Sequence, residues 1–210
     1  IRLWSSTSNC KTDAYGISFG LSRQPKDKNT TGIYKITADN YHVIAVRTVG
    51  KGLIDLPQTG QTRSFHKGDD GDLRMGVPIP KPRFIQSKNG TIKDRLTGLI
   101  WQQSSSNTRY KWKQAFQVVN KLNKQKYAGY SNWRIPNLLE LKSLVITHGY
   151  RWLNKNGFKI ESTLWTSSSW FQPKIKEIRN FFLYMGDGSE GLSRYDIRSV
   201  LAVCGANPPK

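Results

Sequence analysis

The sequence predicts an α+β protein in which two helices pack on short antiparallel sheets, with an additional strand segment near the N-terminus. Two observations predict this class. The second half of the chain runs from a hairpin signal through two amphipathic segments to several short strands, which favours helices gathered on one side of a sheet. In addition, strand-like blocks from the N-terminal quarter recur near the C-terminus.

A hairpin and a strand open the predicted domain. The segments 84–85 and 91–94 flank Asn89-Gly90, a dipeptide that favours a tight hairpin turn because both residues tolerate positive φ. A further strand is predicted at 99–101. Ahead of the hairpin, each proline in 77–82 restricts the residue before it to extended conformations. This stretch therefore reads as an extended linker.

The clearest helix is predicted from Tyr110 to Lys124. Its apolar residues recur at spacings of three and four and so form one buried face: Trp112, Ala115, Phe116, Val119 and Leu122. The opposite face is polar and carries Lys113, Gln117, Asn120, Lys121 and Lys124. The helix therefore displays several ammonium groups along one exposed stripe.

A second helix is predicted to open at Asn137, which can cap it while Glu140 reaches back in a capping box. Its apolar stripe comprises Leu138, Leu141, Leu144 and Val145. Gly149 is expected to end it. From there the pattern is strand and turn, with strands at 164–170, 180–185 and 199–204 and a turn at 186–188.

Three short blocks recur in the same order at offsets of 161, 166 and 157 residues. The paired ranges are 3–8 with 164–169, 15–20 with 181–186, and 43–46 with 200–203. One explanation is a partial internal repeat; the other is that strands rich in Trp and Ser resemble one another by composition. On the first explanation, three parts follow: 1–52, the strand-rich C-terminal third of a related domain; 53–82, an extended linker; and 83–206, a whole domain.

Residues 1–52 are too few to hold a core alone, so this segment is expected to pack on the whole copy, on another chain, or on sequence beyond the stretch given. The start shows neither an initiator Met nor the apolar region of a signal peptide. We expect either a removed leader or a cut piece. No apolar run approaches the roughly 20 residues of a membrane-spanning helix.

Positive charge is concentrated between Arg109 and Lys159, where eleven Lys or Arg residues face one acid, Glu140. That net charge of +10 is over half of the formal +19. Such a bias costs self-repulsion and so points to a polyanionic partner: sulfated glycan, nucleic acid or an anionic membrane surface. The candidate binding residues are Arg109, Lys111, Lys113, Lys121, Lys124, Lys126, Arg151, Lys155, Lys159, Lys174 and Lys176.

The two cysteines, Cys10 and Cys204, and three scattered histidines lack metal-ligand spacing, which argues against a zinc site. A disulfide between the cysteines and two free buried thiols are both compatible with the sequence. A weak metal candidate is the carboxylate cluster of Asp69, Asp70 and Asp72, whose oxygens suit calcium. It lacks the Glu that completes an EF-hand, and a solvated acidic turn is the plainer interpretation.

A series of motifs resembles the C-terminal domain family of bacterial collagen-like adhesins. They are the run 89–101, Trp112 with Ala115, the run 129–137 followed by Glu140-Leu141, and the run 164–168. The stretches 60–62 and 68–73 are similar to the lead-in of such domains. The resemblance covers most of 57–204, and residues 1–47 look like the tail of a second such domain.

The resemblance implies a C-type-lectin-like fold, related to that of formylglycine-generating enzymes, and a location on the bacterial surface or outside the cell. It also implies binding of sulfated glycosaminoglycans and association as trimers. Many members have no known ligand, so the family alone does not supply a function. In this family the run 130–137 looks structural rather than sugar-binding: Trp133 and Ile135 are expected in the core while Arg134 pairs internally.

Catalysis is not expected. A nucleophile needs a base within hydrogen-bond reach, and nothing in the sequence pairs Ser104–Ser106 or Ser167–Ser169 with a histidine. The cysteines do not match the pair used by formylglycine-generating enzymes. The expected function is therefore a surface-exposed or secreted adhesin domain that binds sulfated glycans through a basic patch, with no cofactor. The alternative is an assembly module that contacts an acidic subunit or the anionic envelope; nucleic acid is the least favoured partner because no nucleic-acid motif accompanies the charge.

Overall fold

The computed structural model describes residues 2–8, 13–18, 31–35, 56–145, 149–172 and 176–205, the first three ranges by backbone only. The chain divides into two compact units, Ile1–Ile79 and Pro80–Lys210. The division falls inside the predicted linker. Within the described residues the architecture is mixed α+β, with four α-helices and antiparallel sheets.

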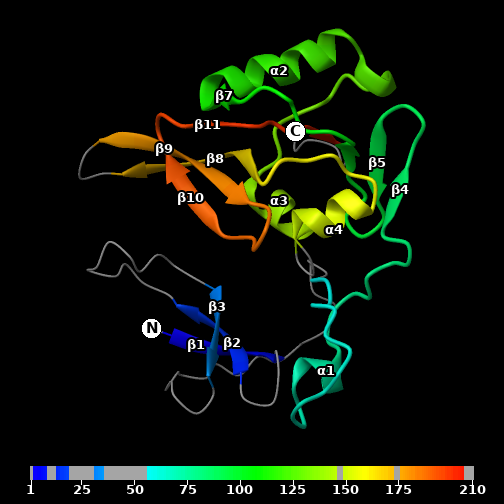
Figure 1. Ribbon diagram of the computed structural model, residues 1–210, viewed down its shortest axis with the longest axis vertical. Coiled ribbons are helices and arrows are strands. Elements are labelled where there is room, and N and C mark those ends of the chain that lie inside the picture. Colours follow the sequence, from blue (N-terminus) through cyan, green and yellow to red (C-terminus); the bar gives the residue numbers. More distant parts are fainter. Residues whose placement is uncertain are drawn as a thin grey trace, which may run out of the picture. The chain divides into compact units, whose positions relative to one another are not determined.

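The first unit contains a three-stranded antiparallel sheet in the order β1-β2-β3 (Figure 1). Its strands are β1 (Arg2–Ser8), β2 (Asp13–Ser18) and β3 (Thr31–Lys35). The short helix α1 (Asp70–Leu73) follows, with Asp69 as its N-cap.

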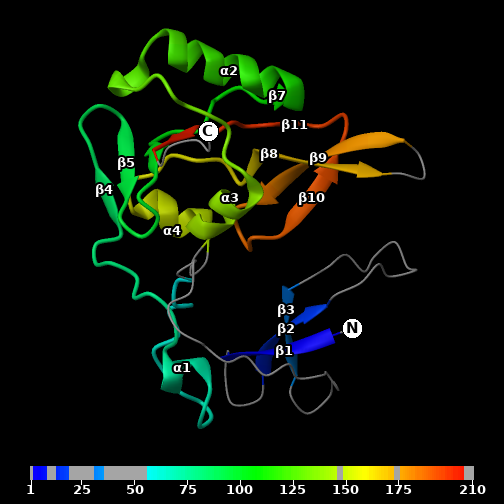
Figure 2. The same cartoon turned by 180° about the vertical axis from the view of Figure 1, so that it is seen from behind.

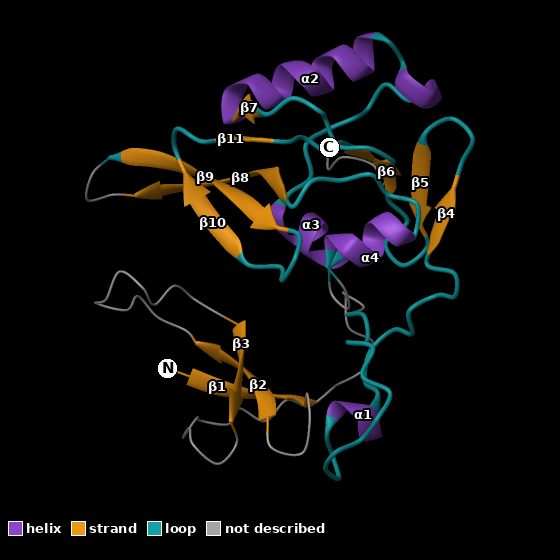
Figure 3. Ribbon diagram, viewed as in Figure 1, coloured by secondary structure: helices purple, strands orange, loops and turns teal. Residues whose placement is uncertain are grey.

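The second unit builds three antiparallel sheets, of orders β12-β6-β5-β4, β10-β9-β8 and β11-β7 (Figure 3). The strands are β4 (Phe84–Gln86), β5 (Thr91–Asp94), β6 (Ile100–Gln102), β7 (Tyr110–Lys111), β8 (Thr163–Gln172), β9 (Glu177–Tyr184), β10 (Glu190–Ser193), β11 (Ile197–Arg198) and β12 (Val203–Cys204). The predicted hairpin at Asn89-Gly90 is confirmed, because β4 and β5 pair across that turn.

The strands of the first unit repeat those of the second in register. Adding 161 to β1 and 166 to β2 converts each β1–β2 partner pair into a β8–β9 pair. The bulge also coincides, falling between Trp4 and Ser8 in one pair and between Trp165 and Ser169 in the other. Strand β3 pairs with β2 as β10 pairs with β9. Residues 43–46 lie outside the described residues, and the assignment of 1–52 as part of a related domain stays a prediction.

The helices of the second unit lie on both sides of its strands, so the prediction that they gather on one side is wrong. Helix α2 (Trp112–Lys124) lies on one side of β8 and β11, while α3 (Leu138–Leu144) and α4 (Tyr150–Lys155) lie on the other (Figures 1 and 2). Neighbouring strand residues explain this arrangement, because successive side chains point to opposite faces. Leu164 joins the core beneath α3 and α4, whereas Trp165 joins the core beneath α2.

Two predicted helix boundaries need correction. Tyr110 and Lys111 form β7, paired with β11, and the helix begins only at Trp112. Gly149 does not end the second helix, which stops at Leu144; it is the N-cap of α4, an additional helix. Six residues hold fewer than two turns, too few to show a helical period in the sequence.

The capping box at α3 is confirmed. The Asn137 side chain accepts a hydrogen bond from the Glu140 amide at 2.8 Å, and the Glu140 carboxylate accepts one from the Asn137 amide at 2.8 Å. The same carboxylate receives two hydrogen bonds from the Arg134 guanidinium, at 2.6 and 2.7 Å. These bonds raise the pKa of Arg134 despite its partial burial. The extended segment before α3 is therefore tied to the first turn of the helix.

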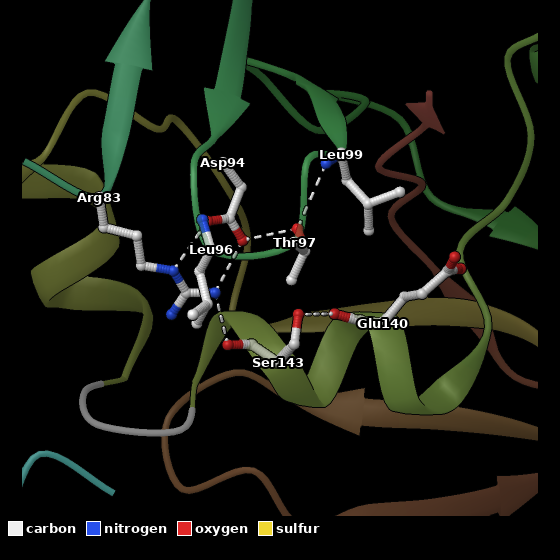
Figure 4. A network of polar contacts seen from close by, with 7 residues as sticks. All are labelled: Arg83, Asp94, Leu96, Thr97, Leu99, Glu140 and Ser143. Atoms are coloured by element: carbon white, nitrogen blue, oxygen red, sulfur yellow. Dashed lines mark hydrogen bonds and ion pairs between the residues drawn. The ribbon is translucent and has the colours of Figure 1, made fainter. Parts of the chain in front are cut away.

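A buried ion pair fastens the β4–β5 hairpin to α3 (Figure 4). The Arg83 guanidinium donates to both carboxylate oxygens of Asp94, at 3.0 and 2.8 Å, and also to the Ser143 carbonyl at 2.8 Å. Asp94 further accepts hydrogen bonds from the Leu96 amide and the Thr97 hydroxyl, each at 3.0 Å. Both charged side chains are buried, so removing either partner costs more stability than removing a partner of a surface pair.

Candidate functional site: the cationic face of helix α2

Five polar residues of α2 form an exposed row, here called the α2 stripe: Lys113, Gln117, Asn120, Lys121 and Lys124. Ala115 and Val119 anchor the opposite face in the core. Gln117, Asn120, Lys121 and Lys124 also line a shallow depression of about 340 Å³. Phe116, predicted to be buried, is 37% exposed because it lies at the edge of the apolar face. The predicted separation of a buried face from a cationic face is otherwise confirmed.

The charges of the second unit are distributed so that the α2 stripe stays uncompensated. Residues 80–210 carry 22 Lys and Arg but seven Asp and Glu, a net charge of +15. Six of the seven carboxylates form ion pairs with other cations: Arg83–Asp94, Arg109–Glu161, Arg134–Glu140, Lys142–Glu190, Arg194–Glu177 and Arg198–Asp196. Within the part of the chain that is described, Lys113, Lys121 and Lys124 therefore have no carboxylate partner.

The seventh carboxylate, Asp187, has local partners. Burial acts to raise its pKa, but hydrogen bonds from the Ser189 hydroxyl and amide together outweigh that effect and leave the pKa below its usual value. It is thus ionised at neutral pH and satisfied within its own turn.

The other candidate cations do not all join this face. Lys111 and Lys126 flank α2 and are exposed. Arg151 and Lys155 lie on α4, on the far side of the strands. Arg109 is 3.6 Å from Glu161 and so is partly compensated. The predicted set therefore divides into groups on different faces, because the strand layer stands between α2 and α4.

The remaining candidates belong to segments other than α2. Lys159 pairs through its backbone with Ser104, and Lys176 lies just before β9 with φ of 50°. Lys174 is outside the described residues.

The acidic turn of the first unit is organised by hydrogen bonds. Asp69 caps α1 through the Asp72 amide at 3.0 Å and accepts the Phe65 amide at 2.9 Å. Asp72 accepts the Gly68 amide at 2.9 Å, and Asp70 accepts the Thr59 hydroxyl. Asp69 and Asp70 are buried, so they are not a solvated turn. Across the described residues, no group of three His, Cys, Asp or Glu is arranged to hold a metal ion.

Cys204 is a free, fully buried thiol in the core beneath α2. Burial raises its pKa to about 11, so it is protonated at neutral pH and a poor nucleophile. Cys10 lies outside the described residues.

The aromatic run before α3 is structural, as predicted. Trp133 and Ile135 are buried, while Arg134 pairs with Glu140. The indole of Trp133 donates to the Tyr127 carbonyl at 3.0 Å, and its ring packs edge-on against Tyr130 at 5.9 Å between centroids. These aromatic side chains hold the connection between α2 and α3.

A groove that the sequence did not predict opens beside α2. It measures about 520 Å³ and is lined by polar residues of the loop after β6, by Lys159, and by Val118 and Tyr127. We call it the Ser104 groove, after Ser104 in that loop. The sequence offered only the Ser104–Ser106 run as a signal, which lacked a base and so suggested no chemistry. The other lining residues come from distant segments that only the fold assembles.

The described part of the second unit thus presents an exposed cationic row on α2 of a mixed α+β domain. The Lcl C-terminal domain family matches residues 90–203, more than half of the chain, and the chain belongs to that family. The resemblance to the C-terminal domain of collagen-like adhesins is thereby confirmed, and the domain is adhesin-related. Comparisons with curated proteins and with solved structures found no match. Of the helices described, none is long and apolar enough to span a membrane.

Proposed function

We propose that this is a surface-exposed or secreted bacterial adhesin domain, of C-type-lectin-like fold, that binds sulfated glycosaminoglycans through the α2 stripe. The observation that carries the proposal is the absence of carboxylate partners for Lys113, Lys121 and Lys124 within the described residues. Sulfates bind ammonium groups as point charges, so lysines without internal partners suit them. The proposal assigns no catalytic activity to the domain and places it outside the cell or on its surface.

The geometry of the helix supports a polymeric ligand. Lys113 and Lys124 are eleven positions apart, which at the rise of an α-helix corresponds to roughly 16 Å. One extended polyanion can therefore contact both ends of the stripe together. Lys113 also lies in the first turn of α2, where no acid is present and where the helix dipole disfavours a cation. Because Lys113 does not stabilise the helix at this position, we take it as a residue that serves binding of an external anion.

The test is a charge reversal of the stripe, Lys113→Glu/Lys121→Glu/Lys124→Glu. We expect heparin affinity at 0.15 M salt to fall by tenfold or more, with a shallower salt dependence, because fewer counterions are released on binding. Stability should change by no more than about 1–2 kcal/mol, since all three side chains are exposed: Glu suits the first turn at position 113, whereas at positions 121 and 124 it replaces cations that the helix dipole favours in the last turn. Heparin affinity chromatography and thermal unfolding measure the two quantities.

A matched control reverses three exposed lysines outside α2: Lys81→Glu/Lys88→Glu/Lys93→Glu. It changes the net charge by the same amount. If both triple variants lose heparin affinity equally, net charge alone explains binding and the assignment to α2 is wrong. Unchanged retention of the α2 variant would contradict the proposed function itself.

One observation favours a second function, an assembly module that bridges acidic surfaces. Arg151 and Lys155 on α4 are exposed and also lack carboxylate partners among the described residues, and α4 lies on the opposite side of the strands from α2 (Figure 1). Cations on two faces suit contact with an acidic subunit, the anionic envelope or further copies, including a trimer. Light scattering separates the functions: a stable oligomer without glycan binding supports assembly, and a monomer that binds sulfated glycans supports adhesion.

A further inference from the structure

The Ser104 groove has a backbone held in place before any ligand arrives. The Ser105 amide donates to the Lys159 carbonyl at 3.0 Å, and the Lys159 amide donates to the Gln103 carbonyl at 2.8 Å. The Ser106 amide donates to the Val200 carbonyl at 2.8 Å, and the Val200 amide donates to the Ser106 hydroxyl oxygen at 2.9 Å. A preorganised loop loses little conformational entropy on binding, so the groove favours affinity.

Several groups of this groove have unused hydrogen-bonding capacity. Within the described residues, the Ser104 hydroxyl, the Asn107 carboxamide and the Lys159 ammonium make no side-chain hydrogen bond or ion pair. Gln102 uses its amide oxygen to accept the Ala202 amide at 3.0 Å, which leaves its NH₂ group available. The groove thus presents one cation, two planar amides and a hydroxyl.

Tyr127 and Val118 also line the groove and supply apolar surface. The Tyr127 hydroxyl donates to the Gly90 carbonyl at 3.2 Å, and its ring packs on Trp133 at 5.6 Å between centroids. Both contacts restrain the ring. A fixed aromatic side chain beside amide and hydroxyl groups is suited to a sugar ring, which has an apolar face and a polar rim.

The charges that line the groove restrict the chemical class of ligand that it can bind. The groove is lined by one cation, Lys159, and by no His, Asp or Glu, so its serines have no base and the site suits binding rather than hydrolysis. One ammonium among several neutral groups matches a ring with one anionic substituent and several hydroxyls. A heavily sulfated ring would leave further charges without partners. The volume of about 520 Å³ lies within the range of small-ligand sites.

We propose that the Ser104 groove binds a uronic-acid ring of a glycan, with Lys159 pairing the carboxylate and Asn107 and Gln102 binding ring hydroxyls. This inference rests on the proposed function, because the α2 stripe would attract the sulfated chain whose uronate the groove reads. The two sites recognise different properties of the glycan. The stripe responds to sulfate density, whereas the groove responds to the carboxylate and hydroxyls of one ring whether or not the chain is sulfated.

The probe that separates the sites is a hyaluronan tetrasaccharide, which carries uronate carboxylates and no sulfate. Titrated into the ¹⁵N-labelled chain, it should shift the amide resonances of residues 104–107 and Lys159. The variant Asn107→Ala/Lys159→Gln should bind it about tenfold more weakly, since a charge-assisted and a neutral hydrogen bond are lost. A carboxyl-reduced tetrasaccharide should bind the unaltered chain about tenfold more weakly as well.

The α2 triple-Glu variant keeps the two proposals distinguishable. It should retain the tetrasaccharide shifts at 104–107 while losing heparin affinity. If those amides do not respond to the tetrasaccharide, or if Asn107→Ala/Lys159→Gln binds it unchanged, the groove assignment is overturned, whatever heparin does. If heparin affinity survives in the α2 variant, the proposed function fails, and the groove is then judged by its own amide shifts.

Discussion

Replacing Asp94 with Asn removes one charge from the buried pair of Figure 4 without changing side-chain size. Asp94 is fully buried and accepts hydrogen bonds from Arg83, Leu96 and Thr97. In the variant the Arg83 guanidinium stays buried, but the Asn side chain offers it one neutral oxygen in place of two carboxylate oxygens, beside the Ser143 carbonyl. We therefore expect an uncompensated buried charge rather than a cavity.

The expected loss of stability is about 3–5 kcal/mol, the usual cost of removing one partner from a buried ion pair. The matched control is Glu177→Gln, which breaks the more exposed pair with Arg194 and should cost about 0–1 kcal/mol. With a urea m-value of roughly 2 kcal/mol/M, the Asp94→Asn midpoint should fall by about 2 M. The two variants therefore differ by far more than the error of an unfolding experiment.

Tryptophan fluorescence in urea is a suitable assay because six of the seven tryptophans lie in residues 80–210. A double variant, Arg83→Met/Asp94→Asn, removes the orphaned charge and should recover part of the lost stability. If Asp94→Asn loses no more stability than Glu177→Gln, or if the double variant is as unstable as the sum of its single variants, the buried-charge reasoning is refuted.

Two further predictions concern the core beneath α2. The buried Cys204 thiol is neutral below about pH 9 in both the folded and the unfolded state, but from about pH 9 to 11 it ionises only in the unfolded state. Over that range the free energy of unfolding should therefore fall by about 2–3 kcal/mol more in the unaltered chain than in Cys204→Ala. Denaturation of both proteins across this pH range measures the difference. Equal slopes would contradict this. Gly191→Ala should cost about 1–3 kcal/mol because its Cβ would overlap the Phe182 ring, whereas Gly186→Ala, whose Cβ meets open space, should be nearly neutral. A calorimetric Tm for each variant decides, and similar values would count against the overlap.

Local signals in the sequence predicted local structure well. Asn89-Gly90 forms its hairpin, and Asn137 with Glu140 forms its capping box, because such motifs involve residues within a few positions of each other. The two-faced character of α2 was equally accessible, since helical period alone separates its apolar and cationic residues. Of its predicted apolar face, Ala115 and Val119 are buried, Trp112 and Leu122 are partly buried, and Phe116, at the border of the two faces, is exposed.

Features that depend on distant partners were missed. Strand β7 consists of two residues and exists because β11, more than 80 residues away, pairs with it. The two sides of the strand layer also have no local signal: Leu164 and Trp165 are both apolar, and only the surrounding fold shows that they enter different cores. The division of the predicted basic patch between α2 and α4 follows from that same layer.

By itself, the sequence determined the family, the excess of positive charge and the cationic row on α2, because composition, motif spacing and helical period are all properties of the chain. The tertiary structure decided which charges stay uncompensated and where a ligand can enter. It brings six carboxylates to other cations and leaves the α2 lysines facing solvent. It also joins a loop after β6, Lys159 and Tyr127 into one groove, since ion pairs and cavities form between residues that are neighbours only in space.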